Sequence, residues 1–213
     1  MSKIIETTVF EFDELSDKAK EKARDWYREG AFDCEWWDSV YEDAVTVANI
    51  LGIEINKKPT TRMDGSPGAG ETCIWFSGFA SQGDGVCFEG SYEYSKGWKK
   101  KLLAYAPKDE GLLRIGQELQ EAQVSLRYEG TATMAHSGHY YHSVCMDISV
   151  DYGEVDIDDS GPEYAIIQCM RDFAGWVYKQ LEAESDYMNS EEAVDDSIEA
   201  NEYTFLESGK RYG

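Results

Sequence analysis

Residues 72–94 read TCIWFSGFASQGDGVCFEGSYEY, and this stretch decides the class of fold. Two runs rich in β-branched and aromatic residues, 72–79 and 86–94, flank a short segment, 80–85, that holds two glycines and an aspartate. Runs of this composition favour strands, and glycine beside aspartate is typical of a tight turn. The stretch therefore predicts a hairpin of two antiparallel strands.

Further strands are expected on both sides of this hairpin, because β-branched and aromatic residues alternate or cluster there. They are predicted at residues 4–12, 53–55, 124–133 and 140–152. At the C-terminal end, 203–206 and 210–212 flank Ser208-Gly209, a pattern that predicts a terminal hairpin. The segment 57–70 holds two prolines and three glycines and is predicted to be a loop.

Apolar residues at helical spacing predict the helices. The expected ranges are 16–30, 34–51, 97–106, 109–123, 163–187 and 190–200. Ser16 is expected to cap the first helix, and Gly52 to end the second. Helices and strands are grouped and do not alternate strictly, which predicts an α+β fold. We expect an antiparallel sheet with an N-terminal αα-hairpin and a long C-terminal helix packed on one face, in a single domain over 1–213.

Acidic residues dominate the charge of the chain. It has 42 acidic and 20 basic side chains among 213 residues, a formal net charge of −22. Residues 147–202 hold 17 of the acidic residues and only two basic ones, Arg171 and Lys179. A chain that is 42% hydrophobic and 13% aromatic can still bury a core, so we expect a folded protein with an acidic C-terminal segment, 151–202, as a subregion.

This charge limits the classes of partner. Autonomous binding of nucleic acid is disfavoured, because the phosphates would be repelled. No apolar run approaches the roughly 18 residues of a membrane span, and no secretory signal is evident, so a cytoplasmic protein is expected. The one basic cluster, Gly97–Lys101, is interpreted as a contact with an acidic neighbour within the fold or across a homodimer.

Cysteines and histidines do not form a recognisable metal motif. The five cysteines are widely spaced, without a Cys-x-x-Cys pair, and are interpreted as core thiols. All three histidines fall within 136–142, where a turn and a strand start would spread them over different faces. A metal site there is the less favoured interpretation, and His142 is open to a local polar pair with Asp147. No cofactor and no metal are expected.

The segment Ser81–Gly85 is the most distinctive local motif. Gly83 and Gly85 permit backbone conformations closed to other residues, and Asp84 lies between them. One interpretation is an exposed carboxylate that binds a partner; the other is a hairpin turn alone. The nucleophile elbow Gly-x-Ser-x-Gly is absent, and the short sequence distance between Cys145 and His142 does not establish a catalytic pair, so no catalytic residue is assigned.

Three segments carry a family resemblance. They are residues 12–20 with 36–44, the segment 76–85, and Tyr140-Tyr-His-Ser-Val-Cys-Met146. In this order they resemble a family of acidic proteins from phages and prophages that is often labelled as an antitoxin of a toxin–antitoxin system. The resemblance implies a small intracellular protein of a mobile element, with an anti-defence, anti-CRISPR-like role as one expectation. It supplies no catalytic residues.

Charge and resemblance together predict an inhibitor of a host nucleic-acid-targeting defence system, either a CRISPR effector or a restriction enzyme. Carboxylates on a rigid surface would occupy a basic groove built for phosphates. Besides Asp84, the candidate partner-binding residues are Asp151, Glu154, Asp156, Asp158, Asp159, Glu191, Glu192, Asp195, Asp196 and Glu199. The alternatives are acidic faces that serve solubility alone, an antitoxin that neutralises a basic toxin, and a metal-assisted enzyme that uses Asp84 and His142.

Overall fold

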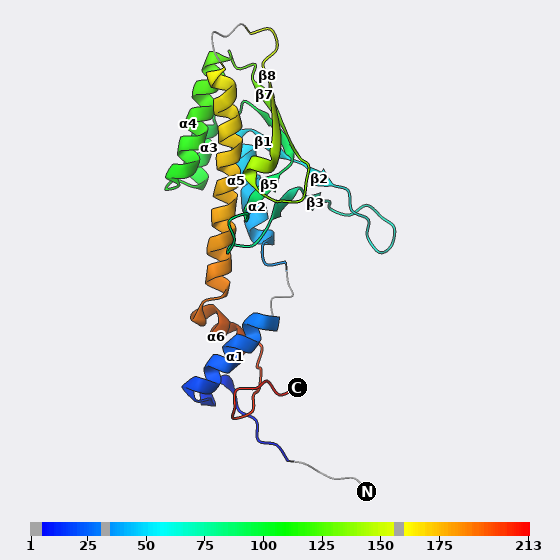
Figure 1. Cartoon of the computed structure of the whole chain (residues 1–213), viewed down its shortest axis with the longest axis vertical. Helices are drawn as coiled ribbons and strands as arrows, with labels where there is room; N and C mark the ends of the chain where they lie inside the picture. The colour runs from blue at the N-terminus through cyan, green and yellow to red at the C-terminus, as the bar shows by residue number, and fades with distance from the viewer. Residues whose placement is uncertain (1–5, 31–34, 156–159) are drawn as a thin grey trace. The chain divides into compact units, whose positions relative to one another are not determined.

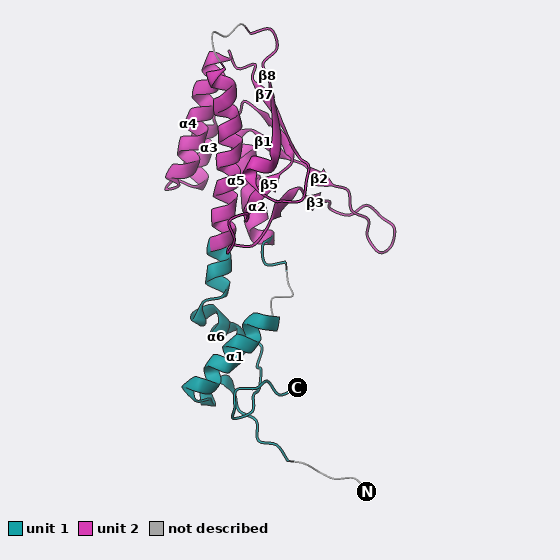
Figure 2. Ribbon diagram, in the orientation of Figure 1, with its two compact units in different colours: residues 1–37, 183–213 teal, residues 38–182 magenta. Residues whose placement is uncertain are grey.

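The computed structural model describes residues 6–30, 35–155 and 160–213. The chain divides into two compact units (Figure 2). Unit 1 comprises residues 1–37 and 183–213, and unit 2 comprises residues 38–182. The predicted α+β class is confirmed, since the described residues form six α-helices and an antiparallel four-stranded sheet (Figure 1).

The four-stranded sheet belongs to unit 2, and its strand order is β1-β6-β7-β8. These strands are Ile53–Ile55, Gly90–Glu93, Thr131–His136 and Met146–Asp151. Their register aligns two rows of apolar or small residues on one face. The rows are Ile53, Tyr92, Ala132 and Val150, and then Ile55, Gly90, Met134 and Ile148. Alternation places polar residues such as Glu54, Ser91 and Thr133 on the other face.

The predicted hairpin at 72–94 is confirmed, but each of its strands is divided. β4 (Ile74–Phe76) pairs with β5 (Val86–Phe88), whereas β6 joins the four-stranded sheet. The division falls at Glu89, whose backbone N–H donates to the carbonyl of Cys73 at 3.0 Å. The short strands β2 (Lys57–Lys58) and β3 (Glu71–Thr72) pair at the base of the predicted loop, and the chain between them projects from unit 2 (Figure 1).

Four helices contribute to unit 2, and α5 packs against the sheet. They are α2 (Asp38–Leu51), α3 (Trp98–Tyr105), α4 (Glu110–Ser125) and α5 (Gly161–Met188), of which α5 continues into unit 1 after Glu182. The buried stripe of α5 includes Phe173, whose ring meets Phe88 edge-on at 5.5 Å. Figure 1 shows α3, α4 and α5 on the same side of the sheet. The helical core therefore covers its apolar face.

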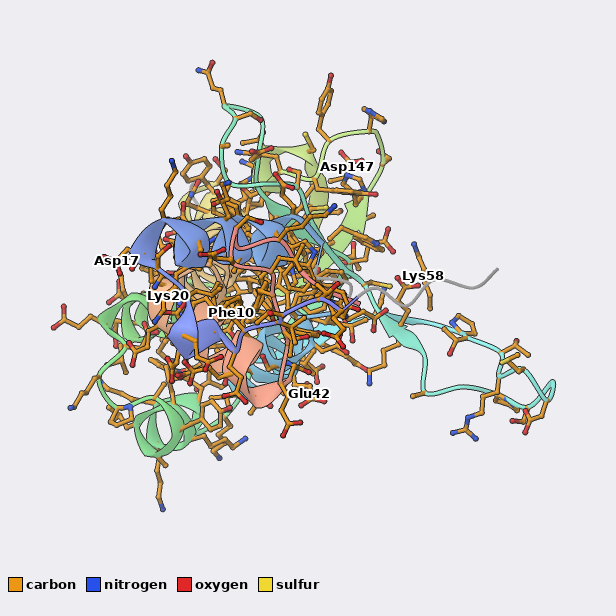
Figure 3. The ribbon with its side chains drawn as sticks, turned by 90° about the horizontal axis from the view of Figure 1, so that it is seen from below. Phe10, Asp17, Lys20, Glu42, Lys58 and Asp147 are labelled. Atoms are coloured by element: carbon orange, nitrogen blue, oxygen red, sulfur yellow. The ribbon has the colours of Figure 1, made fainter. Side chains whose placement is uncertain are left out.

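Unit 1 forms around a small apolar core of its own. Its elements are the 3-10 helix η1 (Phe12–Glu14), α1 (Asp17–Gly30), α6 (Glu191–Ala200) and the C-terminal turn. The buried side chains of its core are Phe12, Leu15, Ala19, Ala23, Val194, Ile198 and Phe205. Lys20, labelled in Figure 3, places its ammonium 5.1 Å from the centre of the Phe12 ring. α6 is thus held by its apolar face, and its polar face points outward.

Several predicted strand limits are wrong. The described part of 4–12 forms only a single bridge, between Phe10 and Phe205. In 124–133, Val124 and Ser125 still belong to α4, and Arg127 and Tyr128 have positive φ angles of 53° and 65°. Residues 124–128 include side chains that favour a strand, but here they complete α4 and the turn that follows it. β7 therefore starts only at Thr131. The predicted terminal hairpin is reduced to a bridge between Phe205 and Arg211.

None of the helices in the described part of the chain has an apolar stretch long enough to cross a membrane.

Candidate partner-binding surface

The helix α6 brings five of the predicted carboxylates together. Ser190 caps it, because its side chain accepts a hydrogen bond from the N–H of Ala193 at 3.3 Å. The acidic residues that follow are favoured at this end by the helix dipole. The five carboxylates are Glu191, Glu192, Asp195, Asp196 and Glu199. Val194 and Ile198 point into the core of unit 1. At about 100° per residue, Glu192, Asp196 and Glu199 occupy the opposite arc, whereas Glu191 and Asp195 lie closer to the buried side.

Two of these carboxylates are engaged by Arg24 of α1. The guanidinium donates from Nε to Asp195 Oδ1 and from Nη2 to Asp195 Oδ2, both at 2.7 Å. Nη1 of Arg24 lies 3.5 Å from Glu191 Oε2 and also contacts Glu21. The hydrogen bonds to Asp195 are the main cause that raises the pKa of Arg24. Asp195 and Glu191 therefore join α6 to α1 within unit 1.

The other three carboxylates of α6 are exposed, and one of them, Glu199, interacts with Asp13 of η1. We call Asp13, Glu192, Asp196 and Glu199 the acidic face. The pKa of Glu199 is raised, first by the charge of Asp13 and further by the charges of Asp195 and Asp196. Like charges on neighbouring turns are unfavourable, so the fold maintains this crowding against repulsion. The acidic face offers closely spaced negative charge on a helix fixed by its apolar side.

Unit 1 as a whole carries a disproportionate share of the negative charge. Residues 1–37 and 183–213 contain 19 acidic and 8 basic side chains, a formal net of −11. Half of the net charge of the chain therefore belongs to fewer than a third of its residues. The spacing of acidic residues on 190–200 was visible in the sequence. The contribution of Asp13 was missed, since nothing in the sequence relates it to Glu199.

Asp84 has a structural role in the turn between β4 and β5. Its Oδ2 accepts hydrogen bonds from the backbone N–H of Ala80 at 2.9 Å and of Ser81 at 2.7 Å. The bond from Ser81 is the main cause that lowers the pKa of Asp84. Gly85 continues the turn without a side chain because a Cβ there would lie 2.8 Å from the His142 ring. The carboxylate is thus directed at the backbone of its own turn.

The remaining predicted carboxylates lie in unit 2 or outside the described residues. Asp151 ends β8 in unit 2, where its Oδ1 accepts a hydrogen bond from the N–H of Gly153 at 2.8 Å. Glu154 follows and is exposed. Asp156, Asp158 and Asp159 lie outside the described residues.

His136 and His142 contact different groups. His136 packs with Trp75 and Tyr141, at ring distances of 6.0 and 5.5 Å. His142 Nδ1 accepts a hydrogen bond from the N–H of Val144, and Asp147 accepts one from Ser137 at 2.9 Å, so the structure uses other partners than the predicted His142–Asp147 pair. Over residues 6–30, 35–155 and 160–213, no cluster of three or more His, Cys, Asp or Glu side chains has the geometry to hold a metal ion.

Comparison with known proteins identifies the family. The model of a domain of unknown function, DUF8835, matches residues 36–191, and the chain therefore belongs to this family. Searches among curated proteins and among solved structures found no match. The matched range contains unit 2, whereas Asp13, Glu192, Asp196 and Glu199 all lie outside it. The acidic face therefore lies outside the part of the chain that the family model covers.

Proposed function

We propose that the protein is an inhibitor whose acidic face binds a groove that normally receives nucleic-acid phosphates. The target class is a host defence system that acts on nucleic acid, such as a restriction enzyme or a CRISPR effector, and the inhibitor itself is not an enzyme. The resemblance to acidic phage and prophage proteins supports this choice of target. It also supports an origin in a phage and action in the host cytoplasm.

The observation that carries the proposal is the crowding of carboxylates around Glu199. Its pKa is raised by neighbouring acids although the side chain is exposed. Residues four apart on a helix are separated by a rise of about 6 Å, so Glu192 and Asp196 present charge at a regular interval. A basic groove would relieve their repulsion on binding, and the complementary charges would speed association.

The test is a pull-down from a nuclease-treated bacterial lysate. The bait proteins are the wild type, the triple variant E192Q/D196N/E199Q and a control variant, E54Q/E93Q/E129Q. The control removes three exposed carboxylates from unit 2, none of which belongs to the acidic face. We expect the wild type and the control to retain the same nucleic-acid-processing protein, and the triple variant to lose it.

Equal retention by the triple variant and the wild type would contradict the proposal. Retention of a small basic protein that does not act on nucleic acid would also contradict it and would favour an antitoxin. Circular dichroism of each bait establishes that it is folded. Because the substituted side chains are exposed, we expect all three proteins to have the same helical content.

A further inference from the structure

A hollow in unit 2 gathers positive charge on a strongly acidic chain. It has a volume of about 400 Å³, within the range of small-molecule sites, and it lies between α4, α5 and the segment 143–144. Its charged lining consists of Arg114, Arg171, Lys179 and Asp172. Three cations thus face one carboxylate. Arg171 and Lys179 are the two basic residues of the segment 147–202, and both line this hollow.

Both oxygens of this single carboxylate, which belongs to Asp172, already have partners. Asp172 Oδ2 lies 3.0 Å from Arg114 Nη1, and Asp172 Oδ1 accepts a hydrogen bond from Gln168 Nε2 at 2.8 Å. Arg114 also contacts Glu118 at 3.2 Å. This pairing neutralises Arg114 and leaves the charge of the other two cations uncompensated.

Arg171 and Lys179 lack such partners. Arg171 Nε is buried without a hydrogen-bond acceptor, and neither cation lies within 4.0 Å of a carboxylate oxygen in the described residues. A buried hydrogen-bond donor without an acceptor destabilises the folded state. Arg171 Nε is such a donor, although the chain has 42 acidic residues. The two residues are eight apart on α5, about 12 Å along the helix axis and about 80° around it, and both line the hollow.

Part of the remaining lining is apolar. Ile115, Val144 and Trp176 contribute apolar surface, and Ser143 and Gln168 contribute polar groups. Trp176 is fixed, since its Nε1 donates to Asp109 Oδ2 at 2.7 Å and its ring stacks on Phe173 at 6.0 Å. Gly175 leaves open space, as a Cβ at this position would meet no atom within 4 Å. A ligand with both an anionic group and an apolar or aromatic body fits this lining.

We propose that the hollow binds a small phosphate monoester, with the phosphate held by Arg171 and Lys179. The lining has a formal excess of two positive charges, which matches the charge of about −1.5 to −2 that a phosphate monoester carries at neutral pH. An arginine fork is suited to phosphate oxygens, and a lysine adds a point charge. All lining residues lie in the matched family range, and none belongs to the acidic face, so this inference is independent of the proposed function.

Isothermal titration calorimetry of the full chain tests the site. The probes are adenosine 5′-monophosphate, adenosine and benzoate. We expect saturable binding of the monophosphate, and binding about tenfold weaker or undetectable for adenosine and benzoate. The variant R171Q/K179Q should weaken binding of the monophosphate by about tenfold or more, because hydrogen bonds to charged groups are lost. The control K99Q/K100Q removes two exposed cations elsewhere in unit 2 and should leave the affinity unchanged.

Because Arg171 is partly buried, K179Q is measured alone as a second variant. Lys179 is exposed, so its substitution should keep the melting temperature and still weaken binding by about threefold or more. The proposal is overturned by any of three results: no saturable binding of the monophosphate up to about 10 mM, benzoate binding of equal strength, or an equal loss in K99Q/K100Q.

Discussion

Arg24 and Asp195 form a bidentate ion pair, in which the Nε–Oδ1 and Nη2–Oδ2 distances are both 2.7 Å. The two residues are 171 positions apart in the sequence. Both side chains are largely buried, at 13% and 26% exposure, so the pair is less screened than a surface salt bridge. The guanidinium of Arg24 also lies over the Phe12 ring, with Cζ 5.8 Å from the ring centre. This pair ties α6 to α1 and fixes the orientation of the acidic face within unit 1.

Replacing Arg24 by lysine should destabilise unit 1. Lysine keeps the charge but cannot make both hydrogen bonds to Asp195, so we expect a loss of about 1–3 kcal/mol in the free energy of unfolding. Chemical denaturation followed by circular dichroism measures it. The exposed control R127K should change the free energy of unfolding by less than about 0.5 kcal/mol. Equal stability of R24K and wild type would show that the pair does not support the unit.

Glu199 should make the protein less stable as the pH rises. Its folded-state pKa is raised above the ordinary value of 4.5, so the folded state favours the protonated form. Its unfavourable contribution is absent at low pH and develops as the pH rises through the ordinary pKa and past the raised one. E199Q should therefore be more stable than wild type at pH 7, and this difference should shrink toward pH 4.

Denaturation at the two pH values, with and without 1 M salt, measures this difference for E199Q and for a control. E207Q removes one exposed charge from the same unit without touching the acidic face, and it should show a smaller dependence on pH. Salt should reduce the advantage of E199Q, because it screens repulsion between exposed charges. An advantage that is the same at pH 4 and pH 7 would contradict the role assigned to Asp13 and its neighbours.

We expect the variant D84A to show that Asp84 stabilises the turn between β4 and β5. The backbone N–H groups of Ala80 and Ser81 would lose their acceptor, so their amide hydrogen exchange should become faster. Because the pKa of Asp84 is lowered in the folded state, its stabilising contribution is present at neutral pH and is lost as the pH falls through that pKa. Loss of partner binding in D84A with unchanged exchange at both amides would instead identify a contact residue.

Two helical glycines should respond in opposite ways to alanine. A Cβ at Gly116 of α4 would lie 2.2 Å from the Trp98 ring of α3, whereas one at Gly175 of α5 would meet nothing within 4 Å. G116A should cost about 1–3 kcal/mol through overpacking, despite the better helix propensity of alanine. G175A should be neutral or stabilise by up to about 1 kcal/mol. Thermal unfolding of both variants decides the comparison, and equal effects would contradict the close packing of α3 on α4.

Sequence reasoning located the helices well because their apolar stripes are long. α5 spans Gly161–Met188 against a prediction of 163–187, and α6 spans Glu191–Ala200 against a prediction of 190–200. Strand limits were less predictable, since residues such as Val124 have β propensity but complete a helix. The acidic residues of α6 were also predicted, whereas their pairing with Arg24 depends on tertiary contact across 171 residues.

Direct competition with duplex DNA tests whether the acidic face occupies a site for nucleic acid. The purified target from the pull-down is titrated with wild-type protein in the presence of increasing duplex DNA, at two salt concentrations. We predict that DNA displaces the protein competitively and that E192Q/D196N/E199Q weakens binding and flattens its salt dependence. Binding that is unaffected by saturating DNA, with the same salt dependence in the triple variant, would contradict the account.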